Sequence, residues 1–273
     1  MSKKKNDAIA KLYDDKKEDL NLALSNPDQL VHHHNGICDP NAAFPDDLTP
    51  EELLKLLHKQ ETDLTRLGIN YLGKVDGSMI GLDAGFGRGG SAILINKRFD
   101  CSVLGLNLSS YQVDFASDLV KKMDLQDKIS FEIGDMCNTR FGNEFFNFIW
   151  ACESTEHVDD LSKMFKEFRR VTKPHAPLLI ITWTKGETML DEEIVKKVND
   201  AYVTNIHFVS EYEESGLNNG WALENKTDLR PQTAAYWKLR ERSTIQSGTE
   251  QFMSTGFNNG ALGYYLLKFT RAL

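Results

Sequence analysis

From residue 79 onward, short apolar runs alternate with longer segments whose apolar residues recur at helical spacing. The runs near 79–84, 101–106, 129–133, 145–150 and 177–183 have the length of buried strands. The segments near 89–98, 109–124 and 160–172 have the pattern of amphipathic helices. Strands and helices that alternate in this way favour an α/β fold built around a parallel sheet.

The regular alternation ends after Trp183. The pattern predicts a helix over Asp191–Val209, strands over Ala222–Leu229 and Gly263–Thr270, and a helix around Ala234–Gln246 between those strands. Such an ending adds an antiparallel edge to an otherwise parallel sheet.

An amphipathic helix is predicted near the N-terminus, from Asn6 to about Leu24, with apolar residues at Ile9, Leu12, Tyr13, Leu20 and Leu24. This apolar stripe would be poorly covered if the helix protruded from a monomer. We therefore expect the helix to pack on the mouth of an active site or on another subunit of a homo-oligomer.

A second N-terminal helix is predicted from Pro50 to Leu72. Thr49 has the place of an N-cap, Pro50 that of the first helical residue, and Glu52 that of the residue that completes a capping box. We interpret residues 1–72 as a helical lid or substrate-capping segment, and residues 73–273 as the catalytic domain.

Composition excludes several classes of function. The formal net charge is −8 and the basic residues are dispersed among carboxylates, which argues against a nucleic-acid partner. Apolar runs such as Pro177–Ile181 are far shorter than the ~20 residues that span a bilayer, and the Lys-rich N-terminus lacks the apolar core of a signal peptide. We expect a cytoplasmic protein without a membrane partner.

The four cysteines do not have the spacing of a metal site. Cys38, Cys101, Cys137 and Cys152 are dispersed through the chain and include no CxxC pair. Dispersed cysteines in a chain of this size are typical of reduced thiols. No structural zinc is predicted.

A glycine-rich turn follows the first strand of the predicted sheet. The strand ends at Asp83 and runs into Gly85 and Gly87, which permit a sharp turn and the close approach of a ligand. A tight packing turn is the alternative explanation of these glycines, so the turn needs support from its context. Asn107 provides this support. It ends the second strand, where a nucleotide-binding site needs a polar group that binds the ribose hydroxyls.

Asn107 weakens a NAD-binding interpretation, because dinucleotide enzymes place Asp or Glu at that position. After the third strand, the Asp135 carboxylate could accept a hydrogen bond from an adenine amino group while Met136 packs on the ring. The alternative for Asp135 is a turn or helix cap.

The segments Leu82–Ser91, Gly134–Met136 and Glu153–Thr155 resemble the motifs of class I S-adenosylmethionine (SAM)-dependent methyltransferases. More narrowly, they are similar to the C-methyltransferases of prenyl and terpenoid substrates, which include the geranyl diphosphate 2-C-methyltransferases and the enzyme that methylates the terpenoid arm of teleocidin. The resemblance implies a Rossmann-like fold with a seven-stranded, mostly parallel sheet and N-terminal helices. It also implies SAM as cofactor, bound by Asp83, Gly85, Gly87, Asn107, Gln112, Asp135 and Met136.

The resemblance covers most of the chain from His32 onward, since His32–Ile37 and Tyr236–Arg240 also match this group. Two departures stand out. Phe86 replaces a cysteine that is common in the glycine-rich turn, and Glu156 and His157 replace an apolar residue and a tyrosine. The second departure leaves the identity of the methyl acceptor open.

The resemblance places Glu153 where substrate meets cofactor, after the fourth strand. An alkene that attacks a sulfonium methyl group becomes a tertiary carbocation, which a nearby carboxylate could stabilise and later deprotonate. A helix cap is the alternative role for Glu153. We also expect His157 to act as a proton acceptor and Tyr202 to stabilise the cation. Further candidates for the pocket wall, which could equally be core residues, are Asn205, His207, Tyr236 and Trp237.

The three consecutive histidines His32, His33 and His34 do not predict a metal site. Neighbouring side chains of an extended segment point to opposite sides, so they do not converge on one ion. The resemblance implies instead that this loop closes over SAM and the substrate.

The leading hypothesis is therefore a C-methyltransferase that acts on a prenyl diphosphate or on a prenylated alkaloid. A diphosphate needs Mg²⁺ or basic side chains. The carboxylates of Glu153, Glu156, Asp159 and Asp160 could hold Mg²⁺ but would repel a bare diphosphate, which favours a neutral acceptor.

Two other hypotheses stay open. In an O- or N-methyltransferase of a small metabolite, Glu153 or His157 would deprotonate a hydroxyl or an amine. A SAM-fold protein without catalysis would be expected to carry a damaged cofactor turn, whereas this turn is intact.

Overall fold

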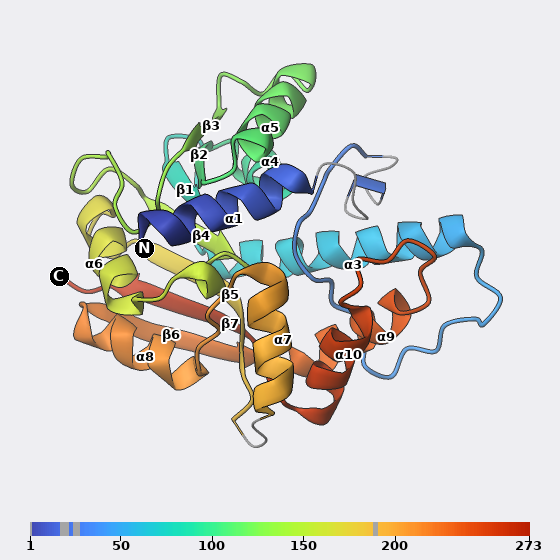
Figure 1. The fold of residues 1–273 in the computed structure, drawn as a ribbon. Helices are drawn as coiled ribbons and strands as arrows, with labels where there is room; N and C mark the ends of the chain where they lie inside the picture. The colour runs from blue at the N-terminus through green and yellow to red at the C-terminus, as the bar shows by residue number, and fades with distance from the viewer. Residues whose placement is uncertain (1, 17–21, 24–27, 188–190) are drawn as a thin grey trace.

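The computed structural model describes residues 2–16, 22–23, 28–187 and 191–273 (Figure 1). Its centre is a seven-stranded sheet with the order β3-β2-β1-β4-β5-β7-β6. Strands β1 to β5 pair in parallel, and β7 pairs antiparallel with both β5 and β6. The bounds are β1 Ile80–Ala84, β2 Ser102–Asn107, β3 Ile129–Ile133, β4 Phe148–Cys152, β5 Pro177–Lys185, β6 Trp221–Asp228 and β7 Leu262–Arg271. The predicted fold class is confirmed.

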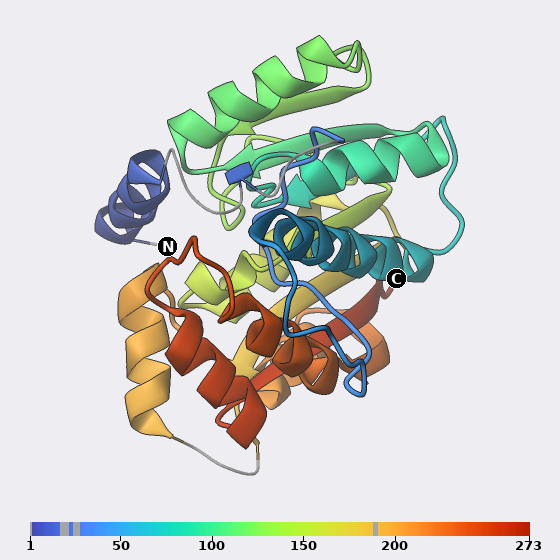
Figure 2. The same ribbon diagram turned by 90° about the vertical axis from the view of Figure 1, so that its right-hand side faces the viewer.

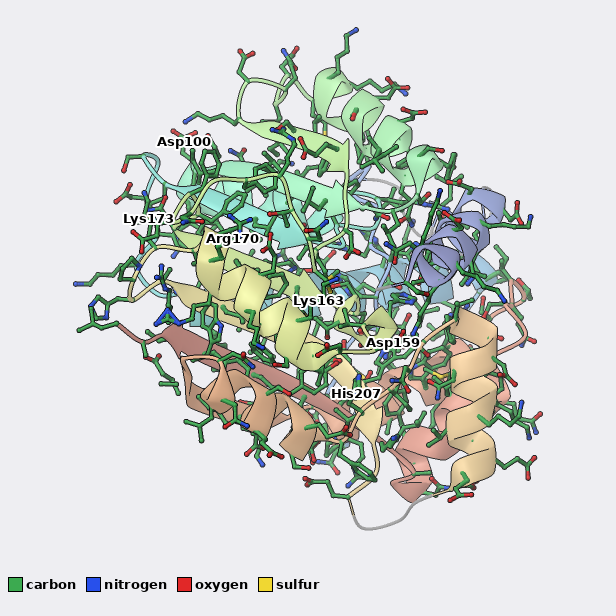
Figure 3. All side chains as sticks on the ribbon, turned by 60° about the vertical axis from the view of Figure 1, so that its left-hand side comes forward. Asp100, Asp159, Lys163, Arg170, Lys173 and His207 are labelled. Atoms are coloured by element: carbon green, nitrogen blue, oxygen red, sulfur yellow. The ribbon has the colours of Figure 1, made fainter. Side chains whose placement is uncertain are left out.

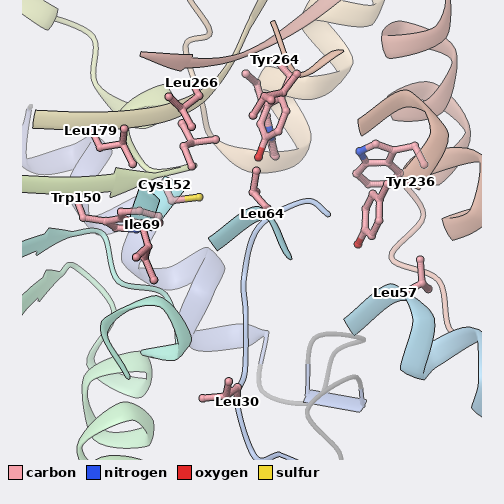
Figure 4. Packing of buried hydrophobic residues seen from close by; sticks show 14 of the residues in the cluster. Leu30, Leu57, Leu64, Ile69, Trp150, Cys152, Leu179, Tyr236, Tyr264 and Leu266 are labelled. Atoms are coloured by element: carbon pink, nitrogen blue, oxygen red, sulfur yellow. The ribbon is translucent and has the colours of Figure 1, made fainter. Parts of the chain in front are cut away.

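The helices cover both faces of this sheet, and each face has its own apolar core. Helices α3, α4 and α5 pack on one face together with α7, α9 and α10, and α6 and α8 pack on the other. Figure 4 shows part of the first core, in which Trp150, Tyr264 and Leu266 of the sheet lie near Leu64 and Ile69 of α3. The bounds are α3 Pro50–Tyr71, α4 Gly90–Phe99, α5 Ser110–Lys122, α6 Leu161–Val171, α7 Glu192–Tyr202, α8 Val209–Asn218, α9 Arg230–Arg240 and α10 Glu250–Asn259.

The N-terminal helix α1, Lys3–Asp15, packs against α5 and lies between α5 and α7 (Figures 1 and 2). Its buried residue Ile9 points into a cavity at the carboxyl ends of the parallel strands. The predicted helix extended to Leu24; Leu20 and Leu24 lie outside the described residues. Helix α3 has the predicted capping box of Thr49 and Glu52.

The region after β5 differs from its prediction. The single helix expected over 191–209 is two helices, α7 and α8, because Val203 adopts a left-handed conformation with φ +55° and ends α7. The helix expected around 234–246 lies at 230–240, and α10 was not predicted. Strand β4 begins at Phe148 rather than near residue 145. Phe145 lies before the strand, and its side chain is 41% exposed.

In the part of the chain that the structure describes, every helix is too short or too polar to cross a membrane.

Candidate active site

One cavity lies where the strands β1 to β4 end, with about 530 Å³ of empty space that includes solvent at its open side. The loops after these strands form its floor, and α1 and the histidine segment 32–34 cover it. The lining residues are Ile9, Tyr13, His33, Gly85, Gly87, Leu106, Asn107, Leu108, Gln112, Gly134, Met136, Glu153, Ser154 and His157. We call this space the cofactor cavity, because the carboxyl ends of strands in an open α/β sheet are where such ligands bind.

The glycine-rich turn has the backbone that the sequence predicted. Gly85 and Gly87 have φ of +87° and +58°, a region that other residues seldom adopt. A Cβ on Gly85 would lie 2.3 Å from Ser154 Cβ, and one on Gly87 would lie 2.9 Å from His33 Cβ. The two glycines are therefore required both by the turn and by the segments that pack against it.

A hydrogen-bonded chain of side chains forms the wall after β2. Asn107 Nδ2 donates to Gln112 Oε1 at 2.8 Å, and Gln112 Nε2 donates to His33 Nδ1 at 3.2 Å. The cavity thus gains two carboxamide groups whose orientation is fixed. Of the predicted cofactor residues, Gly85, Gly87, Asn107, Gln112 and Met136 line the cavity.

Asp83 and Asp135 do not line the cofactor cavity. Asp83 lies beneath the turn, where burial raises its pKa to about 8, and its Oδ2 has no hydrogen-bond partner within the described residues. Asp135 accepts hydrogen bonds from Cys137 N at 2.8 Å and from Asn6 Nδ2 of α1 at 3.0 Å. The carboxylate predicted to bind adenine is thus engaged with the N-terminal helix.

A second, larger cavity of about 1180 Å³ adjoins the first. Its lining is rich in aromatic rings and contains the cations Lys16 and Arg240. The lining residues are Tyr13, Asp15, Lys16, His33, His34, Asn35, Glu153, Trp183, Tyr202, Tyr236, Trp237, Arg240, Ile245, Gln246 and Ser247. We call this space the acceptor cavity.

Glu153 lines both cavities. It follows β4 with φ +48°, an uncommon conformation for a residue with a side chain. Its Oε1 accepts hydrogen bonds from Tyr264 OH at 2.6 Å and from Asn35 N at 2.7 Å. Burial, together with the charge of Glu156, raises the pKa of Glu153 to about 8, against the lowering effect of the Tyr264 and Asn35 hydrogen bonds. A cationic ligand beside it would favour the ionised form.

Glu156 and His157, the residues at which the chain departs from the resemblance, are both buried. Glu156 accepts a hydrogen bond from Trp183 N at 2.8 Å, and burial raises its pKa to about 7. Burial lowers the pKa of His157 to about 4, so the imidazole is neutral near pH 7. His157 lines the cofactor cavity but not the acceptor cavity, where it was expected to meet the acceptor.

Aromatic side chains from α7, α9 and β5 form the wall of the acceptor cavity. The rings of Tyr202 and Trp183 meet edge to face, with centroids 4.9 Å apart. Tyr202 shares a hydrogen bond with Thr249 Oγ1 at 2.7 Å, and Tyr236 donates to Glu61 at 2.9 Å. The ring faces carry negative electrostatic potential, and Lys16 Nζ lies over the Tyr202 ring, 4.9 Å from its centroid.

Two predicted wall residues lie elsewhere. His207, labelled in Figure 3, contacts the carbonyl oxygen of Val158 at 2.8 Å through Nε2 and Glu211 at 3.3 Å through Nδ1. Asn205 donates its backbone N–H to Glu156 O at 2.7 Å. Neither residue lines the cofactor cavity or the acceptor cavity.

The four carboxylates after β4 lie in different parts of the molecule. Asp159 is exposed and forms an ion pair with Lys5, and Asp160 is exposed and caps α6 by accepting from Lys163 N at 3.0 Å (Figure 3). Only Glu153 of the four lines the acceptor cavity. The expected repulsion of a diphosphate by all four carboxylates is therefore wrong, since three of them face other parts of the molecule.

The histidine segment follows the predicted alternation. His32 and His34 contact Thr62 and Thr65 of α3, each at 3.0 Å through Nε2, whereas His33 contacts Gln112 and lines both cavities. Within the described ranges, no three His, Cys, Asp or Glu side chains are grouped in a way that could hold a metal ion.

Several site residues were not recognised in the sequence. The sequence pattern places Tyr13 only on an apolar stripe, although it lines both cavities, and Tyr264 lies far along the chain in β7. The sequence pattern marks Trp183 only as the end of a strand. No local motif marks these residues, because the tertiary fold brings them to Glu153.

Comparisons with known proteins agree with this geometry. Residues 82–180 match the family described as a methyltransferase domain. The geranyl diphosphate 2-C-methyltransferase of Saccharopolyspora erythraea is 31% identical, over 95% of this chain and 92% of that relative. That of Streptomyces ambofaciens is 30% identical, over 95% of this chain and 90% of the relative.

Solved structures give the same result. A geranyl diphosphate methyltransferase in complex with GPP and sinefungin has a TM-score of 0.94 at 28% identity and covers 100% of both chains. The geranyl diphosphate C-methyltransferase of Streptomyces coelicolor, in complex with Mg²⁺, geranyl-S-thiolodiphosphate and S-adenosyl-L-homocysteine, has a TM-score of 0.93 at 27% identity over 98% of both chains. The chain therefore belongs to the family of SAM-dependent methyltransferases that contains the geranyl diphosphate 2-C-methyltransferases.

Proposed function

We propose that this enzyme transfers the methyl group of SAM to a carbon–carbon double bond of a prenyl diphosphate. The observation that carries the proposal is the position of Glu153, which lines both the cofactor cavity and the acceptor cavity and faces aromatic rings in the latter. The relatives named above, which act on geranyl diphosphate, support the same chemistry.

The residues of the cofactor cavity suit SAM, which supplies a methyl group on a positively charged sulfur. Gly85 and Gly87 leave room at the turn for the ligand, and the carboxamides of Asn107 and Gln112 can bind ribose hydroxyls. Met136 offers an apolar surface to the adenine ring. The carboxylate of Glu153, at the wall shared with the acceptor cavity, favours a cationic group beside it.

The acceptor cavity suits the carbocation that alkene methylation requires. When a double bond attacks a methyl group, the acceptor carbon that loses π electrons becomes positive and has no heteroatom to share the charge. Glu153 would stabilise this charge by Coulomb attraction in a cavity with little water. The ring faces of Trp183, Tyr202 and Trp237 would each add about 0.5–2 kcal/mol.

The cations at the acceptor cavity suit a diphosphate head group. Lys16 and Arg240 line the cavity together with the polar residues Gln246 and Ser247. The described residues form no carboxylate cage for a metal, so we expect a Mg²⁺ ion to be held mainly by the diphosphate oxygens, as is usual for this ion at phosphate substrates.

A prenyl arm on a neutral alkaloid is the second candidate acceptor. The observation that favours it is the ion pair between Arg240 and Glu250, which are 2.8 Å apart with each side chain 4% exposed. Because Glu250 offsets the charge of Arg240, the cavity attracts an anionic head group less than its two cations alone would suggest.

We also propose that residues 1–72 act as the cap over both cavities. Ile9, Tyr13 and His33 come from this segment and line the cofactor cavity. Assembly into a homo-oligomer through the N-terminal helix and the cytoplasmic location stay predictions.

The test is a transfer assay with methyl-labelled SAM and three acceptors. Geranyl diphosphate would be assayed with Mg²⁺ and with a chelator, beside a prenylated indole and a simple phenol. We expect label in geranyl diphosphate that depends on Mg²⁺. Transfer to the indole alone would favour the neutral acceptor, and transfer to the phenol alone would contradict C-methylation and favour O-methylation.

A further inference from the structure

The ring of Trp183 forms part of the acceptor cavity, but its main chain lies beyond the end of the neighbouring strand β4. Strand β4 ends at Cys152, which pairs with Ile181 of β5, and Glu153 N donates to Ile181 O at 2.8 Å. Successive residues of a strand direct their N–H and C=O groups to opposite edges, so Trp183 N points to the same edge as Ile181 O. At Trp183 this edge has no strand beside it, since β4 has ended.

The side chain of Glu156 takes the place of the strand at this point. Its Oε1 accepts a hydrogen bond from Trp183 N at 2.8 Å, and the residue is only 1% exposed. A buried N–H needs such a partner, because an unpaired one loses its hydration without compensation. Glu156 therefore fixes the main chain of Trp183 on the edge that β4 leaves open.

The main chain of Glu156 holds a second segment of the cavity wall. Its carbonyl oxygen accepts from Asn205 N at 2.7 Å, three residues after Tyr202 ends α7. The rings of Tyr202 and Trp183 both line the acceptor cavity and meet edge to face, with centroids 4.9 Å apart. One residue thus joins the main chains that carry the two rings.

We infer that Glu156 is a positioning residue: its bond to Trp183 N sets where the Trp183 and Tyr202 rings stand around the methyl acceptor. The inference rests on the proposed function, in which these ring faces stabilise the cation. Glu156 lines neither cavity, so it acts through the rings. It also stands where the C-methyltransferases that the chain resembles have an apolar residue, which could not accept this hydrogen bond.

The competing explanation is that Glu156 acts through its charge. An ionised Glu156 raises the pKa of Glu153, which lines both cavities. Two substitutions separate charge from position. Glu156→Gln removes the charge but keeps an oxygen that reaches Trp183 N, and its NH₂ group takes the place of Oε2, which has no hydrogen-bond partner within the described residues. Glu156→Asp keeps the charge, but its side chain is one methylene shorter and withdraws from Trp183 N.

The first measurement is steady-state kinetics on geranyl diphosphate with Mg²⁺. The cation develops only during methyl transfer, so misplaced rings should lower kcat more than they raise the KM of the methyl acceptor. For Glu156→Asp we expect kcat to fall about tenfold, with KM changed by less than about threefold. For Glu156→Gln we expect kcat within about threefold of wild type. SAM affinity should stay at the wild-type value in both variants, because Glu156 does not line the cofactor cavity.

The second measurement follows the Trp183 ring without using activity. The chain has four tryptophans, so fluorotryptophan labelling gives few fluorine NMR signals, and Trp183→Phe assigns the one of interest. We expect this signal to move in Glu156→Asp and to keep its wild-type position in Glu156→Gln. If Glu156→Asp does not fold, Glu156→Met replaces it, since a methionine side chain cannot take the place of the carboxylate oxygen either.

Asp160→Asn is the matched control, because it removes an exposed carboxylate from the same loop and asparagine can still cap α6. We expect wild-type kcat and a wild-type fluorine signal. A larger loss of kcat in Glu156→Gln than in Glu156→Asp would overturn the inference in favour of charge. Wild-type kcat or an unmoved signal in Glu156→Asp would overturn it outright. Absence of any methylated prenyl product from wild type would instead contradict the proposed function, and the fluorine signal would still decide whether Glu156 positions the ring.

Discussion

The cofactor cavity and the acceptor cavity share a wall but are built differently. The floor of the cofactor cavity consists of loops that follow the neighbouring strands β1 to β4, with the backbone of Gly85 and Gly87 at its centre. The acceptor cavity combines Glu153 after β4 and the segment 33–35 with side chains from α1, β5, α7, α9 and the loop after α9. The cofactor cavity is formed at the ends of neighbouring strands, which the topology of the sheet brings together. The acceptor cavity is formed by segments that are distant in sequence and that only tertiary packing brings together.

Because of this difference, the binding of SAM and the methyl transfer itself depend on different cavities. A change in the turn of the cofactor cavity alters the backbone conformation and the space on which the ligand depends. A change in the acceptor cavity leaves that turn intact and alters the charge or the rings around the acceptor. Variants of the two cavities should therefore differ in whether SAM binding or turnover is lost.

The largest effect is expected for Gly87→Val. A β-branched residue disfavours φ +58°, and its Cβ would lie 2.9 Å from His33 Cβ, so the turn and the histidine segment must both shift. We expect SAM affinity to fall by about 100-fold or more, a loss of roughly 2.7 kcal/mol. Calorimetry of SAM binding measures it, with circular dichroism to verify folding; wild-type affinity would contradict the assignment of the turn.

A smaller effect is expected when residues 1–24 are deleted. The deletion removes Ile9 and Tyr13 from the cofactor cavity and the Asn6 contact of Asp135, but leaves the glycine turn. We expect turnover to fall by about 10-fold or more through water access to the site. Mass in solution would be measured beside turnover. If neither quantity changes, the helix neither caps the site nor joins subunits.

The smallest effect is expected for Tyr264→Phe. The Tyr264 hydroxyl donates to Glu153 and thereby lowers the pKa of that carboxyl, which lies at about 8 in the free enzyme. If the ionised carboxylate is the active form, kcat/KM rises with pH through this value. Loss of the donor raises the pKa, so the rise should move to higher pH and activity near pH 7 should fall severalfold. A pH profile that does not move would argue against ionised Glu153 as the active form.

The parts of the fold that follow local rules could be predicted from the sequence. The strand and helix alternation through Lys185 and the capping box at Thr49 depend on periodicity and on neighbouring residues. Gly85, Gly87 and Asn107 could be placed for the same reason, because they stand at the ends of consecutive strands. The division into α7 and α8 was missed because it depends on one left-handed residue, Val203.

The acceptor cavity could not be assembled from the sequence. Tyr13 is 140 residues from Glu153 by number, and Tyr264 is separated from it by 111 residues. Only the packing of α1 and β7 brings these hydroxyls to the site. Likewise, four carboxylates that are close in sequence face different parts of the molecule, because a short 3₁₀ turn, Thr155–His157, directs Glu156 inward while Asp159 and Asp160 stay exposed.

The most direct test of the account is the turnover of Glu153→Gln on the acceptor that wild type methylates. The substitution keeps the size of the side chain and removes its negative charge from the wall that both cavities share. We expect SAM binding close to wild type and turnover lower by about 100-fold or more, the usual scale for losing a positioned charge stabiliser or base. Wild-type turnover in this variant would mean that the carboxylate is structural, and would contradict the cation-stabilising role assigned to it.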